Sequence, residues 1–183
     1  MTILAALGAM AASDGVLSRE VSSAFGGMLG VDGYSQFFKF LIAATLAMTA
    51  LLSVKSVSGG RVSRAEYHVL LLLAATGMMF AASALDLLIL YLGLELVTLC
   101  SYILVGITVE RPTANEGAIK YFLLGSFASA LFLYGISLTY GVVGSTNFGE
   151  IAGVLAGDAG QPLLLVGMVL VTAGLAFKIA AVP

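Results

Sequence analysis

The stretch Tyr91-Leu-Gly-Leu-Glu-Leu-Val-Thr-Leu-Cys-Ser-Tyr102 lies in the middle of an apolar run that extends from about Leu85 to Ile107. A run of this length can cross a bilayer, because roughly 20 helical residues at a rise of about 1.5 Å each span the hydrocarbon core. Glu95 sits near the centre of the run. A carboxylate at that depth costs about 2.5–3.5 kcal/mol on insertion scales, so it is seldom carried without a function. The stretch therefore predicts a transmembrane helix that carries a functional carboxylate.

The polar residues of this helix share one face. Helical spacing places Tyr91, Glu95, Thr98 and Tyr102 on a single stripe, while the rest of the helix is apolar. We therefore expect Glu95 to face other protein or a hydrated cavity, and not lipid. The alternative is a structural carboxylate that accepts a hydrogen bond from a Tyr or Thr on a neighbouring helix.

The composition is that of an integral membrane protein. The chain has 183 residues, of which 60% are hydrophobic and only 10% charged, whereas a soluble domain carries about 25% charged residues. The net charge is −2 and the eight basic residues are scattered, which argues against nucleic-acid binding. The single cysteine, Cys100, allows no disulfide within the chain, and no cluster of metal ligands is present in the sequence.

The apolar runs predict an all-α, polytopic helix bundle. Residues 1–34 are expected to form a partial or interfacial N-terminal segment, in which residues 13–33 are a loop or an interfacial segment. Residues 35–183 are expected to form a transmembrane helix bundle. A second polar, Gly-rich loop is expected over residues 143–160. The five predicted spans lie at about 35–57, 66–84, 85–107, 115–142 and 162–181.

Basic residues predict the orientation of these spans. The loops on one side contain Lys55, Arg61, Arg64 and Arg111, whereas the loops on the other side contain only Arg19. The positive-inside rule places the first set of loops in the cytoplasm.

Two lysines also lie within predicted spans. Lys120 follows Glu116 by four residues, which favours an ion pair along one helix, and it also lies close enough to the helix end for its ammonium to reach the cytoplasmic interface. Lys178 precedes Pro183 in an apolar run, and a proline there would break the helix. Broken helices at membrane depth often mark ion sites. The alternative for Lys178 is an interfacial anchor at a simple helix end.

Other polar residues have simpler interpretations. His68, Glu66 and Asp86 lie at or near the ends of predicted spans, where we expect interfacial or solvated side chains. The small-residue pattern Gly125-x-x-x-Ser129 is typical of helix packing.

Four segments together resemble the proton-pumping membrane subunits of complex I, the NADH:quinone oxidoreductase, and in particular its subunit N (subunit 2). They are Leu92-Gly-Leu-Glu-Leu96 with Tyr102, Glu116-Gly-Ala-Ile-Lys-Tyr-Phe-Leu-Leu-Gly-Ser126, Tyr134-Gly-Ile-Ser-Leu-Thr-Tyr140 and Gly174-Leu-Ala-Phe-Lys-Ile-Ala-Ala-Val-Pro183. The resemblance covers about residues 66–183, whereas residues 1–60 match only loosely.

The resemblance implies part of an antiporter-like fold with two inverted five-helix repeats and broken central helices. The chain differs from the family at its end: it stops at Pro183, where the family's broken helix continues into a second half. We therefore expect an N-terminal fragment of a longer subunit. The family also implies the sidedness that the basic residues predict.

The resemblance further implies roles for residues. Glu95 matches the family's helix-borne glutamate, Lys120 matches a lysine on the next helix, and Lys178 matches the lysine beside the helix break. The resemblance implies that a glutamate–lysine pair among such residues acts as a charge switch. Implied partners are the other membrane subunits of complex I and the lipid bilayer of the inner (plasma) membrane. NADH and quinone would react elsewhere in the complex, with no cofactor, metal or redox site in this chain.

Alternative interpretations remain at this point. The same fold implies, as alternatives, a subunit of a multi-subunit sodium/proton antiporter or of a membrane-bound hydrogenase. A different class of function is a truncated, non-pumping scaffold.

Overall fold

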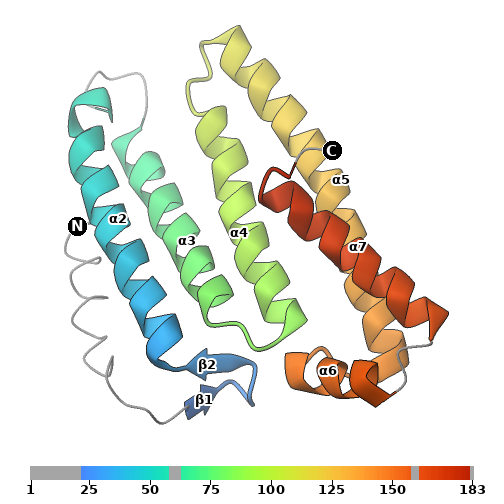
Figure 1. Ribbon diagram of the computed structural model, residues 1–183. Helices are drawn as coiled ribbons and strands as arrows, with labels where there is room; N and C mark the ends of the chain where they lie inside the picture. The colour runs from blue at the N-terminus through green and yellow to red at the C-terminus, as the bar shows by residue number, and fades with distance from the viewer. Residues whose placement is uncertain (1–21, 58–62, 158–160, 182–183) are drawn as a thin grey trace.

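The computed structural model describes residues 22–57, 63–157 and 161–181 (Figure 1). This part of the chain forms a helix bundle with one small β-hairpin at its N-terminal end. The hairpin pairs two short antiparallel strands. The elements are β1 (Ser22–Ala24), β2 (Leu29–Val31), α2 (Gly33–Val57), α3 (Arg64–Ala82), α4 (Leu87–Val105), α5 (Pro112–Val143), α6 (Phe148–Gly157) and α7 (Pro162–Lys178).

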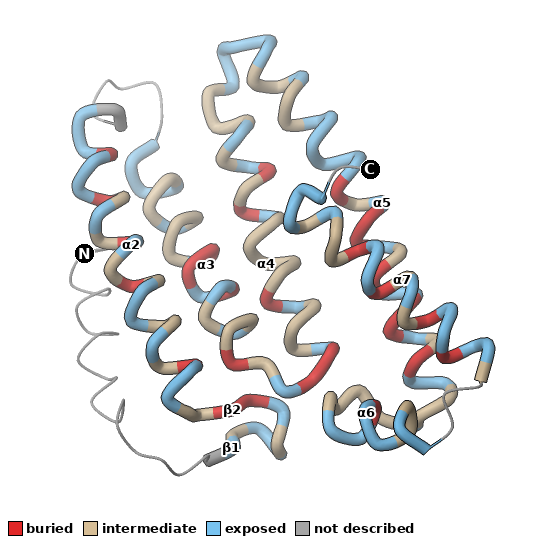
Figure 2. The backbone as a smooth tube through the Cα atoms, in the orientation of Figure 1, coloured by how far each residue is buried: buried red, intermediate tan, exposed pale blue. Residues whose placement is uncertain are grey.

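The long helices stand side by side, and α7 crosses the lower half of α5 (Figure 1). The hairpin and α6 lie at the same end of the bundle. A core cluster joins α4, α5, α6 and α7 near this end, and its buried members are Leu87, Phe132, Ile136, Ile151 and Val171. Figure 2 shows buried residues where α7 passes α5 and exposed residues along the outer sides of the helices.

Close backbone contact holds α3 against α4. A Cβ atom added to Gly77 would lie 2.6 Å from the carbonyl oxygen of Gly93, and one added to Gly93 would lie 2.8 Å from the carbonyl oxygen of Gly77. Small residues at such a crossing let two membrane helices approach closely. Glycine at both positions therefore fixes the spacing between α3 and α4.

Among the described residues, four helices are long and apolar enough to cross a membrane, namely α2, α3, α4 and α5. Many large apolar side chains on these helices are exposed, such as Leu52, Ile103 and Phe127. An exterior of this kind suits contact with lipid or with other membrane helices. Helices α2, α3, α4, α5 and α7 overlap the five predicted spans. The five spans and the division of the chain at residue 34 stay predictions, and residues 1–21 lie outside the described residues.

The two predicted loops contain regular structure. The segment 13–33 includes the β-hairpin, and the segment 143–160 includes α6. In α6 the apolar residues Phe148, Ile151 and Leu155 fall on one helical face, and all three join the core cluster. The glycine content of this segment concealed that pattern, so the loop prediction was wrong here.

The expectation for Asp86 was also wrong. Asp86 caps the N-terminus of α4 and is only 3% exposed. Its Oδ1 accepts a hydrogen bond from the Leu88 amide at 2.8 Å, and its Oδ2 accepts one from the Thr146 hydroxyl at 2.6 Å. Two backbone bonds join the same loops, from the Leu87 amide to the Thr146 carbonyl and from the Phe148 amide to the Leu85 carbonyl. The start of α4 is thus tied to the end of α5.

Replacement of Asp86 by Ala is expected to destabilise this end of the bundle by about 2 kcal/mol or more. The change removes a helix cap and leaves the partly buried Thr146 hydroxyl without its partner. Thermal unfolding in detergent measures the effect as a lowered midpoint. Asp86→Asn is the control, because its side-chain carbonyl retains the cap and its amide can donate to Thr146. An unchanged midpoint in Asp86→Ala would show that the buried carboxylate contributes nothing.

Candidate functional site

Glu95 lies in the middle of α4 and contacts α5. The polar stripe predicted that it faces other protein or a hydrated cavity, without naming α5. Its Oε2 accepts a hydrogen bond from the Ser129 hydroxyl at 2.7 Å. The Lys178 ammonium lies 3.3 Å from the same oxygen. The Glu95 side chain is 19% exposed and that of Lys178 is 5% exposed. The pair is therefore a largely buried ion pair between α4 and α7, with α5 contributing a hydroxyl.

Lys178 is surrounded by oxygen atoms from three residues. Besides Glu95, its Nζ donates to the Thr98 Oγ1 and to the Ser129 Oγ, each at 3.0 Å. An ammonium group carries three donors and no acceptor, so three acceptors satisfy it completely. Both hydroxyls have other acceptors for their own protons, in Glu95 and in the α4 backbone. The donor and acceptor pattern fits a charged lysine opposite a charged glutamate.

The end of α7 explains how a lysine reaches the interior of the bundle. At 17 residues, or roughly 26 Å, α7 is shorter than the spanning helices. Beyond it the Ala181 amide donates to the Ala176 carbonyl and the Ala180 amide to the Phe177 carbonyl. Ala180 adopts a positive φ of 54°, so this is a Schellman-type helix end. Such an end favours a cation in the last turn, where Lys178 lies.

This helix end differs from the predicted one. The sequence suggested a span to about residue 181 that Pro183 would break, whereas α7 ends at Lys178. The left-handed residue Ala180 closes the helix before the proline is reached. Pro183 itself lies outside the described residues.

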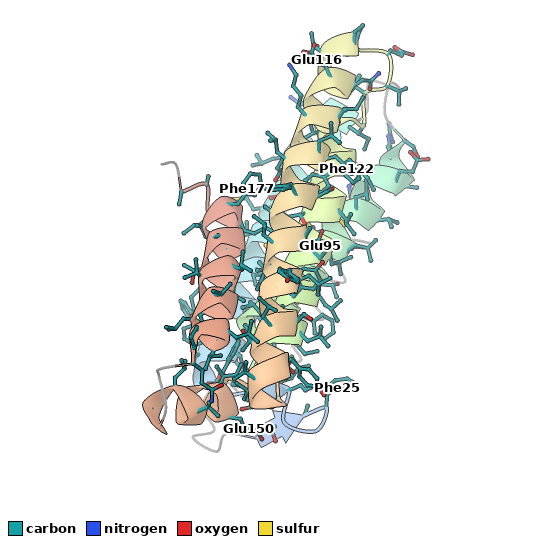
Figure 3. The ribbon with its side chains drawn as sticks, turned by 90° about the vertical axis from the view of Figure 1, so that its right-hand side faces the viewer. Phe25, Glu95, Glu116, Phe122, Glu150 and Phe177 are labelled. Carbon is teal, nitrogen blue, oxygen red and sulfur yellow. The ribbon has the colours of Figure 1, made fainter. Side chains whose placement is uncertain are left out.

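Lys120 occupies a different place. It pairs with Glu116 along α5, as the four-residue spacing predicts, and the two side chains are 70% and 63% exposed. Figure 3 shows Glu116 near one end of α5 and Glu95 in the middle of the bundle. The structure therefore brings together two of the three predicted site residues and leaves Lys120 outside their contacts.

Two residues of the site were not assigned to it from the sequence. Thr98 was only placed on the polar stripe, and Ser129 was interpreted as a packing residue. Ser129 is 5% exposed and contacts both members of the ion pair. The sequence offered one signal for this role of Ser129. It lies one helical turn after Gly125, on a face of small residues that can approach another helix. The sequence alone does not reveal which face of α5 meets Glu95.

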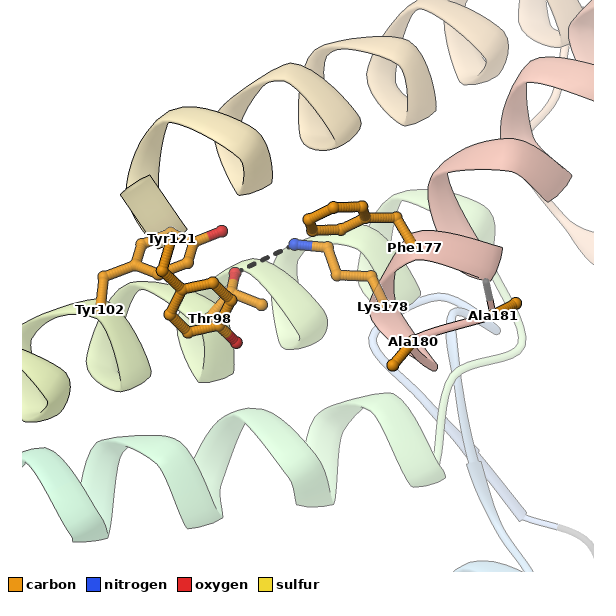
Figure 4. Close-up of a pocket in the computed structure, with 7 residues that line it drawn as sticks. All are labelled: Thr98, Tyr102, Tyr121, Phe177, Lys178, Ala180 and Ala181. Atoms are coloured by element: carbon orange, nitrogen blue, oxygen red, sulfur yellow. Dashed lines mark hydrogen bonds between the residues drawn. The ribbon is translucent and has the colours of Figure 1, made fainter. Parts of the chain in front are cut away.

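A cavity of about 410 Å³ lies beside the ion pair. Figure 4 shows it between the end of α7 and the tyrosines of α4 and α5, with the Lys178 ammonium directed to Thr98. The lining residues are Thr98, Tyr102, Tyr121, Phe177, Lys178, Ala180 and Ala181. The site thus combines a buried ion pair, two hydroxyls and a space next to the lysine. Such a combination is typical of groups that exchange protons or ions across a membrane.

The family model described as the transmembrane domain of NADH:quinone oxidoreductase and Mrp antiporters matches residues 84–183, which is more than half of the chain. The chain belongs to this family. The match contains Glu95, Lys120 and Lys178. It confirms the family resemblance that the sequence motifs indicated and the all-α, antiporter-like membrane fold. The protein is therefore a multi-pass membrane protein.

Individual relatives agree with this assignment. Subunit N 2 of the NADH-quinone oxidoreductase of Rhizobium meliloti (strain 1021) is 44% identical over 92% of this chain and 35% of its own length. A chain of respiratory complex I from Thermus thermophilus, solved with bound aureothin, is 37% identical over 100% of this chain and 38% of its own, with a TM-score of 0.75.

A second solved structure shares the fold. It is a chain of the membrane-bound sulfane sulfur reductase, an archaeal respiratory membrane complex. Its TM-score is 0.84 at 24% identity, with 96% of this chain and 38% of that chain covered. The chain thus spans a little over a third of the length of these relatives.

Proposed function

We propose that this chain is part of a proton-translocating membrane subunit of an NADH:quinone oxidoreductase in a bacterial plasma membrane. The observation that carries the proposal is the buried Glu95–Lys178 pair, which lies where α7 ends inside the bundle. The identity to subunit N of such enzymes supports the same assignment. The partners would be the other membrane subunits of that complex.

In this proposal Glu95 controls the proton on Lys178. Two opposite charges about 4 Å apart attract by about 4 kcal/mol at an effective dielectric constant of about 20. When Glu95 is close, Lys178 keeps its proton. When the two separate, Lys178 passes the proton on.

Lys120 is proposed as a further proton carrier on α5. The support is its match to the family motif, together with its ion pair to Glu116 near the start of the helix. That pair lies toward the end of the bundle that the basic residues place in the cytoplasm. Because Lys120 does not contact Glu95 or Lys178 in the described part of the chain, a proton would pass between them through other groups or through water.

Electron transfer is proposed to occur in partner subunits. Iron–sulfur clusters need several cysteine or histidine ligands. In residues 22–57, 63–157 and 161–181, no group of three His, Cys, Asp or Glu side chains is placed to hold a metal ion. The reaction of NADH with a quinone would then drive proton movement in this subunit from a distance.

Purification of the complete subunit from its native membrane tests the assignment. An affinity tag on the full-length protein is expected to recover a complex that oxidises NADH, reduces a quinone and acidifies vesicles without added sodium. Recovery with a hydrogenase or a sulfur reductase, or proton movement that depends on sodium, would contradict the proposal. Sodium-dependent proton movement would favour a subunit of an antiporter. This is the second candidate function, because the family description includes Mrp antiporters and the sulfane sulfur reductase chain has the same fold.

A further inference from the structure

Ser129 contacts both charges of the ion pair with a single hydroxyl group. Its Oγ donates a hydrogen bond to the Glu95 Oε2 at 2.7 Å and accepts one from the Lys178 Nζ at 3.0 Å. A serine hydroxyl has one proton to donate and lone pairs that accept. Within the described part of the chain, Glu95 is the only acceptor of that proton. The direction in which Ser129 donates is therefore set by the ion pair.

Thr98, the other hydroxyl at Lys178, is bound differently. Its Oγ1 accepts from the Lys178 Nζ at 3.0 Å, but its own proton is directed to the carbonyls of Leu94 and Glu95 in α4. That proton has an acceptor in the backbone of its own helix. Movement of the Glu95 side chain therefore leaves the hydrogen bond that Thr98 donates unchanged, whereas Ser129 loses its acceptor.

Glycines hold α7 closely against α5, as Figure 1 shows for the course of the two helices. A Cβ atom added to Gly174 would lie 2.5 Å from the Cβ of Phe132, and one added to Gly135 would lie 2.7 Å from the carbonyl oxygen of Gly167. Small residues at such contacts let membrane helices pack tightly against each other. We therefore treat α5 and α7 as one closely packed helix pair.

The ion pair joins this helix pair to a second one. Helices α3 and α4 are packed through Gly77 and Gly93 and carry Glu95, whereas α5 and α7 carry Ser129 and Lys178. In the proposed function Glu95 moves away from Lys178. Ser129 then stays beside Lys178, because both residues lie on the same helix pair.

We propose that Ser129 is a positioning residue whose hydrogen bond with Lys178 reverses when the lysine loses its proton. The inference rests on the proposed function. An ammonium group only donates, so Ser129 accepts from charged Lys178 and donates to Glu95. Once Glu95 has moved away and Lys178 is a neutral amine, the amine has a lone pair, and the Ser129 O–H turns to donate to it. No covalent bond of Ser129 breaks or forms.

This reversal strengthens the charge switch in both of its states. Beside Glu95, Ser129 stabilises the protonated form of Lys178. Away from Glu95, it stabilises the neutral form. Ser129 therefore widens the range of pH over which Lys178 is protonated in the paired state and neutral in the separated state. Proton uptake needs both conditions, so its pH profile has an acidic and an alkaline limit.

Ser129→Ala in the complete subunit within its assembled complex tests this role. The change removes one oxygen and adds no group. We expect the NADH-driven proton uptake rate to fall about threefold or more, because hydrogen bonds to the charged pair are lost. We also expect the pH range of uptake to narrow from both sides. Proton uptake into inverted vesicles, measured from acidic to alkaline pH, gives both results.

Thr139→Val is the matched control. Thr139 is a fully buried hydroxyl residue on the same helix, and its Oγ1 donates to the Gly135 carbonyl within α5. Valine retains the shape of the side chain and removes a hydroxyl that does not contact the ion pair. We expect uptake and its pH range to stay as in the wild type. Ser129→Cys is a second test variant, since a thiol is a weaker donor and acceptor than a hydroxyl. Its pH range should lie between those of the wild type and Ser129→Ala.

Three outcomes would overturn the inference. The first is wild-type uptake and pH range in assembled Ser129→Ala, and the second is a wild-type pH range in Ser129→Cys. The third is uptake that falls by the same factor at every pH, which would assign Ser129 to helix packing alone. Parallel measurement of Glu95→Gln separates these outcomes from failure of the proposed function. If Glu95→Gln lowers uptake and Ser129→Ala does not, only the role of Ser129 is wrong.

Discussion

Glu95→Gln is expected to lower proton translocation at least fivefold while the complex still assembles. In the wild-type protein the Ser129 hydroxyl and the Lys178 ammonium both contact Oε2 of Glu95. Glutamine has nearly the same size and retains a side-chain oxygen that can accept from both. It lacks the negative charge that holds the proton on Lys178. Without that charge, movement of α4 relative to α7 no longer changes the protonation equilibrium of the lysine. Proton uptake into inverted vesicles during NADH oxidation measures the loss.

The control for Glu95 is Glu116→Gln. Glu116 also pairs with a lysine, but its side chain is 63% exposed. Exposed pairs contribute little, typically below about 1 kcal/mol. We expect assembly to be retained and uptake to fall by less than half. Glu95→Asp should retain part of the activity because it keeps the charge at a greater distance from Lys178. Normal uptake in an assembled Glu95→Gln complex would contradict the charge switch and favour the scaffold interpretation.

Lys178→Met has the second large expected effect, again a loss of at least fivefold in proton uptake. Methionine has a similar length but carries no proton. The change also leaves Glu95 buried without its cation, and loss of one partner of a buried pair costs about 3–5 kcal/mol unless the remaining charge is neutralised. We therefore expect a lowered unfolding midpoint together with the loss of uptake. The same vesicle assay and thermal unfolding in detergent measure the two effects.

Lys178→Arg separates the two effects of that substitution. Arginine keeps the positive charge beside Glu95 but does not release its proton at physiological pH. Stability should therefore recover more than uptake does. Lys55→Met is the control for loss of a lysine outside the site, since Lys55 is an exposed residue in the last turn of α2. Normal uptake in Lys178→Arg would show that the lysine acts only as a fixed charge.

Hydropathy predicted the long helices well because a membrane span leaves a strong signal in one sequence. It also predicted that Glu95 faces protein, since the polar stripe of α4 has helical spacing. It did not predict α6, whose ten residues are too few to span and include three glycines. Hydropathy did not predict the hairpin either, because each of its strands has only three residues.

Contacts between distant segments could not be derived from spacing. The Glu95–Lys178 pair joins residues 83 positions apart. The family resemblance implied a glutamate–lysine pair but did not say which lysine lies beside Glu95. The bond between Asp86 and Thr146 joins residues 60 positions apart, and no motif pointed to it. Asp86 was therefore expected in solvent although it is buried. Ser129 was missed for the same reason, since its role depends on which face of α5 meets α4.

A double-mutant cycle on proton uptake tests the central claim that Glu95 and Lys178 work as one unit. The uptake rate is measured for Glu95→Gln, Lys178→Met and the double variant, each as an assembled complex. Residues that act together show non-additive effects. We predict that the double variant is no slower than the slower single variant. Losses that multiply, so that two fivefold effects combine to about 25-fold, would show that the two residues act independently and would contradict the charge switch.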